Sequence, residues 1–163
     1  MPRVEESRKV GYVGWKQPLD ELDGHIDKHA ILIGHSAGAA AIVRRLGERE
    51  IVIKKLILVA PWYIPDSDVR MISSQTGLSV DPRDADGLRD LYNFQISSEI
   101  TSRVTDEIIV ITSNDSYRLL LSADCYIEAL QATHIIVPDR GHFNSSYGDG
   151  HINDTLPELL EFL

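Results

Sequence analysis

The chain has 163 residues, of which 43% are hydrophobic and 25% are charged, and its formal net charge at pH 7 is −9. A chain of this length builds one hydrophobic core, so we expect a single domain over residues 1–163. The acidic balance argues against nucleic acid as a partner, because phosphate binding depends on clustered lysine and arginine side chains. No apolar stretch approaches the roughly 18 residues that span a bilayer, so we expect no membrane insertion.

The amino terminus, residues 1–9, is charged throughout and lacks the apolar region of a secretory signal. We therefore expect a cytoplasmic protein. The single cysteine, Cys125, excludes an internal disulfide, and its helical surroundings favour a small buried or half-buried thiol over a catalytic nucleophile.

Four apolar, β-branched runs along the chain are typical of buried parallel strands. They cover residues 30–33, 56–59, 108–111 and 134–137. Helical patterns cover residues 39–46 and about 117–130, and a Thr-x-x-Glu capping box with an early proline opens a short amphipathic helix in residues 155–163. The alternation predicts an α/β fold, a doubly wound and mostly parallel sheet with helices on both faces.

Residues 34–38 read Gly-His-Ser-Ala-Gly, a G-x-S-x-G pattern set between the first predicted strand and the helix that follows it. This arrangement is typical of a nucleophile elbow, a tight turn that exposes a serine hydroxyl, here that of Ser36, above the sheet. We expect side chains at Gly34 and Gly38 to collide with the neighbouring strand and helix. The alternative is a glycine-rich turn whose serine only caps the helix.

Residues 61–103, between the second and third strands, are too long for a simple crossover and too polar for another core strand. We interpret them as a cap inserted over the carboxyl edge of the sheet, with an Asp-rich loop at residues 81–86 that leads into a helix. The segment contains Trp62, Tyr63, Leu91, Tyr92 and Phe94. These residues either shape an apolar substrate pocket near Ser36 or simply hold the insertion on the domain, and both interpretations stay open.

A serine nucleophile needs a general base within hydrogen-bond reach, and the base needs an acid that fixes its tautomer. Asp115 lies in the loop after the third predicted strand, and His142 lies in the loop after the fourth. The carboxyl ends of parallel strands share one edge of the sheet, so we expect both side chains beside Ser36. The chain order Ser, Asp, His is also that of the α/β hydrolases.

Both partners have a plainer interpretation, because an aspartate after a strand often caps the next helix and a histidine beside glycine is often a turn residue. His151, in a polar loop, is the second choice for the base, and Asp139 and Asp106 are weaker candidates for the acid. The remaining histidines are less suitable by position: His25 and His29 precede the first strand, His134 begins a strand, and His35 lies in the turn and is expected to point away.

Together these motifs resemble a family of small serine hydrolases, the retinoblastoma-binding protein 9 and YdeN type. The resemblance rests on residues 31–38, on the Ser-Asn-Asp turn at 113–115 and on the Asp-Arg-Gly-His-Phe loop at 139–143, and it covers roughly residues 12–163. It implies a compact α/β hydrolase with a short cap that acts on small esters or amides. Ser36 would be the nucleophile, Asp115 the acid and His142 the base, with no metal or cofactor.

Two features depart from the family pattern. Where the family usually has two acidic residues after the third strand, this chain has Asn114 and Asp115. The family also begins with a strand, a glycine-rich loop, a helix and a second strand, about 30 to 40 residues, before the region of Trp15. That segment normally supplies one backbone amide of the oxyanion hole, and the residue after the nucleophile, here Ala37, supplies the other.

Without those additional strands, residues 30–33 form an apolar sheet edge, which is a template for pairing. We therefore expect either a homodimer through this edge or residues 1–14 folded back over it, unless the chain is a truncated form of a longer protein. The principal prediction is a serine hydrolase of small esters or amides that uses a Ser-His-Asp triad and an acyl-enzyme intermediate. The alternative is a catalytically impaired hydrolase fold that serves as a binding or interaction module.

Overall fold

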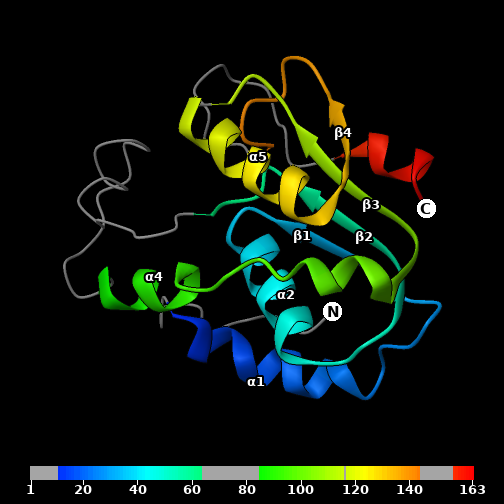
Figure 1. The fold of residues 1–163 in the computed structure, drawn as a ribbon. Coiled ribbons are helices and arrows are strands. Elements are labelled where there is room, and N and C mark those ends of the chain that lie inside the picture. The colour runs from blue at the N-terminus through cyan, green and yellow to red at the C-terminus, as the bar shows by residue number, and fades with distance from the viewer. Residues whose placement is uncertain (1–10, 64–84, 116, 144–155) are drawn as a thin grey trace.

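Parallel strands form the centre of the computed structural model, which describes residues 11–63, 85–115, 117–143 and 156–163. In these residues one sheet contains β1 (Ile31–His35), β2 (Ile53–Val59), β3 (Val104–Thr112) and β4 (Thr133–Ile136), side by side in that order (Figure 1). Each strand overlaps a predicted apolar run, so the predicted α/β class is confirmed. The prediction that all of them are buried is wrong for β4, whose residues are largely exposed because it is an outer strand.

The strand register places the loops after β1, β3 and β4 at one edge of the sheet. Val59 of β2 is the partner of His35 on one side and of Ile111 on the other. Ile111 is in turn the partner of Ile135 in β4. Because all strands are parallel, the loops that carry the candidate serine, aspartate and histidine leave the sheet close to one another.

One face of the sheet is covered by α2 (Ala37–Glu48), α5 (Tyr117–Leu130) and the 3₁₀ helix η1 (Ser98–Arg103). Both α-helices lie where the sequence predicts them, in front of the strands in Figure 1. Their apolar side chains join those of the sheet in a core cluster whose buried members are Ala39, Val43, Leu46, Ile53, Leu56, Leu58, Ile100, Ile108, Val110, Ala123, Tyr126 and Leu130. Burial of this apolar surface is the main stabilising term of the fold.

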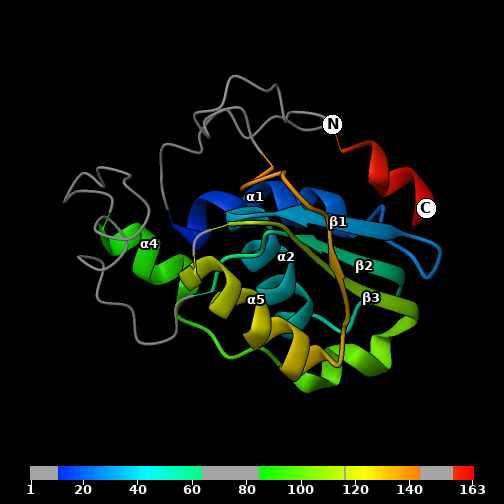
Figure 2. The ribbon, with the colours of Figure 1, turned by 90° about the horizontal axis from the view of Figure 1, so that it is seen from above.

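The other face of the sheet packs against Phe143 and the carboxyl-terminal segment. Successive strand residues point to opposite faces, so this second cluster uses the alternate positions, Ile57, Val59, Ile109 and Ile111. The predicted carboxyl-terminal helix is present as a 3₁₀ helix, η2 (Pro157–Glu161), rather than an α-helix. Figure 2 shows it on the opposite side of the sheet from α2 and α5.

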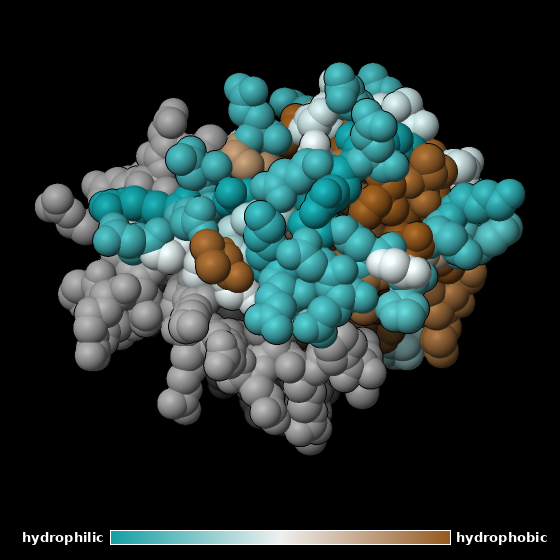
Figure 3. All heavy atoms as spheres, turned by 90° about the horizontal axis from the view of Figure 1, so that it is seen from below, coloured by the Kyte–Doolittle hydropathy of each residue, from teal (hydrophilic) through white to brown (hydrophobic). Residues whose placement is uncertain are grey.

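A further helix, α1 (Tyr12–Asp23), packs on α2 and on α4 (Ala85–Tyr92). The sequence analysis assigns no element to it, because Pro18 removes a hydrogen bond that a regular helix needs. Polar side chains cover its outer side, so the centre of the face seen in Figure 3 is hydrophilic. None of the helices in the described residues combines the length and apolar character that crossing a membrane requires.

Charged side chains fix α1 on α2. Arg45 of α2 is only 3% exposed and forms ion pairs with Asp20 and Asp23 of α1. The hydroxyl of Tyr12 donates a hydrogen bond of 2.8 Å to Glu48 Oε2 at the other end of α2. A guanidinium that is removed from water in this way needs both carboxylates, because an unpaired buried charge is strongly unfavourable.

The described ends of residues 61–103 are attached to the domain by aromatic side chains. The Tyr63 hydroxyl donates to the Phe94 carbonyl at 2.7 Å, and the Tyr126 hydroxyl of α5 donates to the Trp62 carbonyl at 2.8 Å. The helix predicted after the Asp-rich loop is confirmed as α4. Residues 64–84 lie outside the described residues, so the predicted cap over the sheet edge stays a prediction.

The outer strands of the described sheet are β1 and β4. Ile33 of β1 is 41% exposed and Ile136 of β4 is 68% exposed. The predicted homodimer through the β1 edge, and its alternative of residues 1–14 folded over that edge, stay predictions, because residues 1–10 lie outside the described part of the chain.

Candidate active site

The turn between β1 and α2 holds Ser36 in an unusual backbone conformation. Its φ is 53° and its ψ is −122°, which side-chain-bearing residues adopt only where surrounding contacts enforce it. The Ser36 amide donates a hydrogen bond of 3.0 Å to the Val59 carbonyl of β2, which fixes the turn to the sheet. The Ser36 side chain therefore leaves the carboxyl edge of the sheet at the start of α2.

The two glycines of the motif differ in how closely other atoms approach them. A Cβ atom at Gly34 would lie 2.7 Å from Ala39 Cα and 2.9 Å from Ala39 N, closer than such atoms can stand. A Cβ atom at Gly38 would meet only the Trp15 side chain, at 3.7 Å, which is an ordinary contact. The predicted collision is therefore confirmed at Gly34 and wrong at Gly38, where the chain leaves room for a methyl group.

Ser36, His142 and Asp115 lie in one hydrogen-bonded chain, although they come from three separate loops. His142 Nε2 is 2.9 Å from Ser36 Oγ, and His142 Nδ1 is 2.5 Å from Asp115 Oδ2. The Asp115 side chain is only 3% exposed and that of His142 is 11% exposed. When Nδ1–H donates to the carboxylate, Nε2 is left as an acceptor for the serine hydroxyl, which is the arrangement a general base requires.

The other candidate residues lie elsewhere. Asp106 sits near the start of β3 with Lys55 Nζ at 3.6 Å, far along the strand from the carboxyl edge. His134 Nε2 is 2.7 Å from Thr112 Oγ1, and His25 and His29 lie in the connection between α1 and β1. Asp139 lies on the loop of His142, as its sequence position requires. His151, the second choice for the base, lies outside the described residues.

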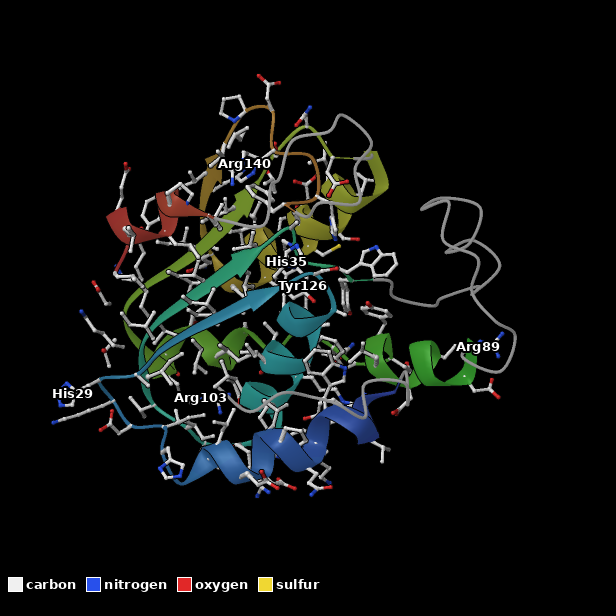
Figure 4. The ribbon with its side chains drawn as sticks, turned by 180° about the vertical axis from the view of Figure 1, so that it is seen from behind. His29, His35, Arg89, Arg103, Tyr126 and Arg140 are labelled. Atoms are coloured by element: carbon white, nitrogen blue, oxygen red, sulfur yellow. The ribbon has the colours of Figure 1, made fainter. Side chains whose placement is uncertain are left out.

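His35 contributes to the site, contrary to the expectation that it points away. Its Nε2–H donates a hydrogen bond of 2.8 Å to the carbonyl oxygen of His142, and the two rings have centroids 5.1 Å apart. Figure 4 shows His35 at the carboxyl edge of the sheet, on the same side as the loop that carries Arg140. Sequence analysis missed this contact because it joins a side chain to a backbone oxygen 107 residues away.

Partial burial lowers the pKa of His35, the hydrogen bond to the His142 carbonyl opposes this shift, and the His142 ring also lowers the value. Folding therefore disfavours the proton, and the stability that His35 contributes is present above its unfolded pKa, about 6.5, and is lost as pH falls through it. We expect the stability advantage of the wild type over His35→Gln to shrink between about pH 7.5 and 5.5. Urea unfolding of both proteins at each pH measures it, and a constant difference contradicts the expectation.

The first turn of α2 provides a favourable place for negative charge beside Ser36. Ala37 is the first residue of the helix, and amides in the first turn have no partner within the helix. No acidic side chain lies in that turn, so the positive end of the helix dipole is not neutralised there. In the described residues, no group of three or more histidine, cysteine or carboxylate side chains is placed to hold a metal ion.

Comparisons with solved structures show the same architecture. The ydeN gene product from B. subtilis is 20% identical, with a TM-score of 0.62 over 99% of this chain and 73% of that protein. A carboxylesterase of the thaumarchaeon Nitrososphaera gargenis is 14% identical, with a TM-score of 0.55 over 93% and 70% of the two chains. The monoacylglycerol lipase of Paleococcus ferrophilus is also 14% identical, with a TM-score of 0.52 over 86% and 70%.

These structural likenesses establish the α/β hydrolase fold, since their sequence identities are low. The comparison with curated proteins gave no match. The comparison with family models matched residues 11–160 to the family described as serine hydrolase. Because that match extends over nearly the whole length of the chain, the chain belongs to the serine hydrolase family.

Proposed function

We propose that this chain hydrolyses small esters or amides through an acyl-enzyme intermediate, with Ser36 as nucleophile, His142 as general base and Asp115 as the acid that orients it. The observation that carries the proposal is the unbroken hydrogen-bonded chain from Ser36 Oγ through both ring nitrogens of His142 to Asp115 Oδ2. A serine hydroxyl is a weak nucleophile at neutral pH, and this arrangement is the one that activates it.

In the first half of the reaction, Ser36 Oγ attacks the substrate carbonyl carbon while its proton passes to His142 Nε2. The carbonyl π electrons move onto oxygen, which gives a tetrahedral oxyanion. When that intermediate collapses, the bond to the leaving group breaks and His142 returns the proton to the departing alkoxide or amine. Water then attacks the acyl-serine with the same base, which releases the acid and restores Ser36.

The oxyanion needs hydrogen-bond donors in fixed positions, and the amide of Ala37 is the proposed donor from this chain. It follows the nucleophile directly and begins α2, where the helix dipole favours negative charge. One such donor contributes about 2.7 to 4 kcal/mol of transition-state stabilisation.

The ester class is supported by the chemistry of proteins with the same fold. Two of the similar structures are described as a carboxylesterase and a monoacylglycerol lipase. Both names denote enzymes that cleave a carboxylic ester, the substrate on which a serine nucleophile acts most readily because its leaving group is an alkoxide. Small amides are the second class, because His142 would protonate the departing amine.

A fluorophosphonate probe tests the proposal, because an activated serine displaces fluoride from phosphorus and stays covalently attached. We expect the wild type to bind about one probe per chain and Ser36→Ala to bind none. Ser102→Ala is the matched control, since Ser102 is an exposed serine on η1, outside the hydrogen-bonded chain of Ser36, and this variant should label like the wild type. A folded wild type that takes up no probe would overturn the proposal and favour the interaction module.

A further inference from the structure

Ser113 and Asn114, the residues before Asp115, connect the loop after β3 to the loop after β4. Ser113 Oγ accepts a hydrogen bond of 2.8 Å from the backbone amide of Arg140. Asn114 Oδ1 accepts one of 3.0 Å from the backbone amide of Gly141, and one of 2.8 Å from the Ser113 hydroxyl. Two neighbouring side chains of one loop thus bind two neighbouring amides of the other.

These hydrogen bonds fall immediately beside the His142–Asp115 contact. The acceptors are the two residues before Asp115, and the donors are the two residues before His142. Both loops are therefore held together one residue away from the 2.5 Å contact between the imidazole and the carboxylate. A shift of either loop would change that contact directly.

The loop after β4 has a backbone that needs such support. Asp139 and Phe143 adopt positive φ values of 58° and 54°, which are uncommon for residues with side chains, and Gly141 has a φ of 52°. Strained conformations of this kind persist only where surrounding contacts determine them. The amides of Arg140 and Gly141 lie inside this stretch, so their bonds to Ser113 and Asn114 act on the strained backbone itself.

We propose that Ser113 and Asn114 are positioning residues of the hydrolytic reaction, which act by holding the His142 loop against Asp115. The inference rests on the proposed function. Asn114 supplies only its oxygen to these contacts, so an aspartate in its place keeps the acceptor and the shape. Ser113 is 4% exposed and uses its hydroxyl both as donor and as acceptor, so replacing it leaves a buried amide without its partner.

The proposal is tested with Asn114→Leu, which keeps the size but removes the acceptor, and Asn114→Asp, which restores it. The readouts are kcat and KM for p-nitrophenyl acetate. Displacement of a catalytic group by about 1 Å costs on the order of 100-fold, so we expect Asn114→Leu to lower kcat by about 10- to 100-fold, with KM within about threefold. We expect Asn114→Asp to recover kcat to within about threefold of the wild type.

The pH dependence separates positioning from general stability. The added negative charge of Asn114→Asp favours protonation of His142, so the acid limb of its pH–rate profile should move to higher pH, by less than about one unit because Asn114 is exposed to solvent. Asn114→Leu should lower the plateau and leave the limb where it is. A residue that only stabilises the loop would change the melting temperature and neither of these features.

Each failure has a distinct signature. If Asn114→Leu is folded and keeps kcat within about twofold, the inference is wrong, while loss of probe labelling in Ser36→Ala would still support the proposed function. If the wild type takes up no fluorophosphonate, the proposed function itself fails. Should Asn114→Leu not fold, Asn114→Ala takes its place against Asn114→Asp, and equal kcat values for that pair at equal melting temperature overturn the inference.

Discussion

Asp115→Asn is expected to lower kcat for p-nitrophenyl acetate by about 10⁴-fold while the protein remains folded. The Asp115 side chain is nearly buried, and its carboxylate lies 2.5 Å from His142 Nδ1. Asparagine has the same shape, but its amide N–H₂ group presented to Nδ1 favours the tautomer that carries its proton on Nε2. That proton meets the Ser36 hydroxyl, so the base can no longer accept from the nucleophile.

The matched control is Asp139→Asn, which removes a carboxylate from the His142 loop itself. Its kcat should stay within about twofold of the wild type, because Asp139 is not the partner of His142 Nδ1. The rate of fluorophosphonate labelling should fall in parallel with kcat for Asp115→Asn. A loss smaller than about tenfold for Asp115→Asn, or equal losses for both variants, would show that Asp115 does not orient the base.

Local patterns in the sequence are sufficient to predict the centre of this fold. The β-branched runs give the positions of the strands, and the alternation of strand and helix gives a parallel sheet whose loops share one edge. That geometry is enough to bring together residues as distant as Ser36 and His142, 106 positions apart, from their order along the chain. The predicted catalytic roles of Ser36, Asp115 and His142 stay a proposal, supported by their hydrogen-bonded geometry.

What the sequence could not predict are contacts between side chains and distant backbone atoms. His35 appears to the sequence as one variable position of a G-x-S-x-G motif, yet its ring binds the carbonyl of His142. Asn114 is visible only as a departure from the family pattern, although its amide oxygen holds Gly141. Such contacts have no periodic or compositional signal, because the backbone partner can belong to any residue type.

Helix α1 illustrates a different limit. Its residues contain Pro18 and no regular apolar stripe, and its position depends on Arg45 of α2, which pairs with Asp20 and Asp23. Tertiary contacts of this kind override weak local preference. The same override explains η2, where a capping box and an early proline predict an α-helix but the chain forms a 3₁₀ turn against the sheet.

Gly34→Ala and Gly38→Ala should change stability in opposite directions, although both are glycines of the same motif. At Gly34 the new methyl group would lie 2.7 Å from Ala39 Cα and 3.1 Å from Gly38 C, and these backbone atoms can move away only if the turn shifts. We expect a loss of about 3 kcal/mol in the free energy of unfolding, at the upper end for overpacking. The shift of Ser36 should also lower kcat by on the order of 100-fold.

At Gly38 the methyl group meets only the Trp15 ring, at 3.7 Å, and Gly38 has no positive φ that alanine would resist. Alanine is the better helix former, so Gly38→Ala should gain up to about 1 kcal/mol. Urea unfolding of the two variants measures the difference, with kcat as the second readout. Because each substitution adds one methyl group within the same turn, a difference of about 3 to 4 kcal/mol isolates the close approach of Ala39 to Gly34, whereas equal losses would show that the turn excludes any side chain at both positions.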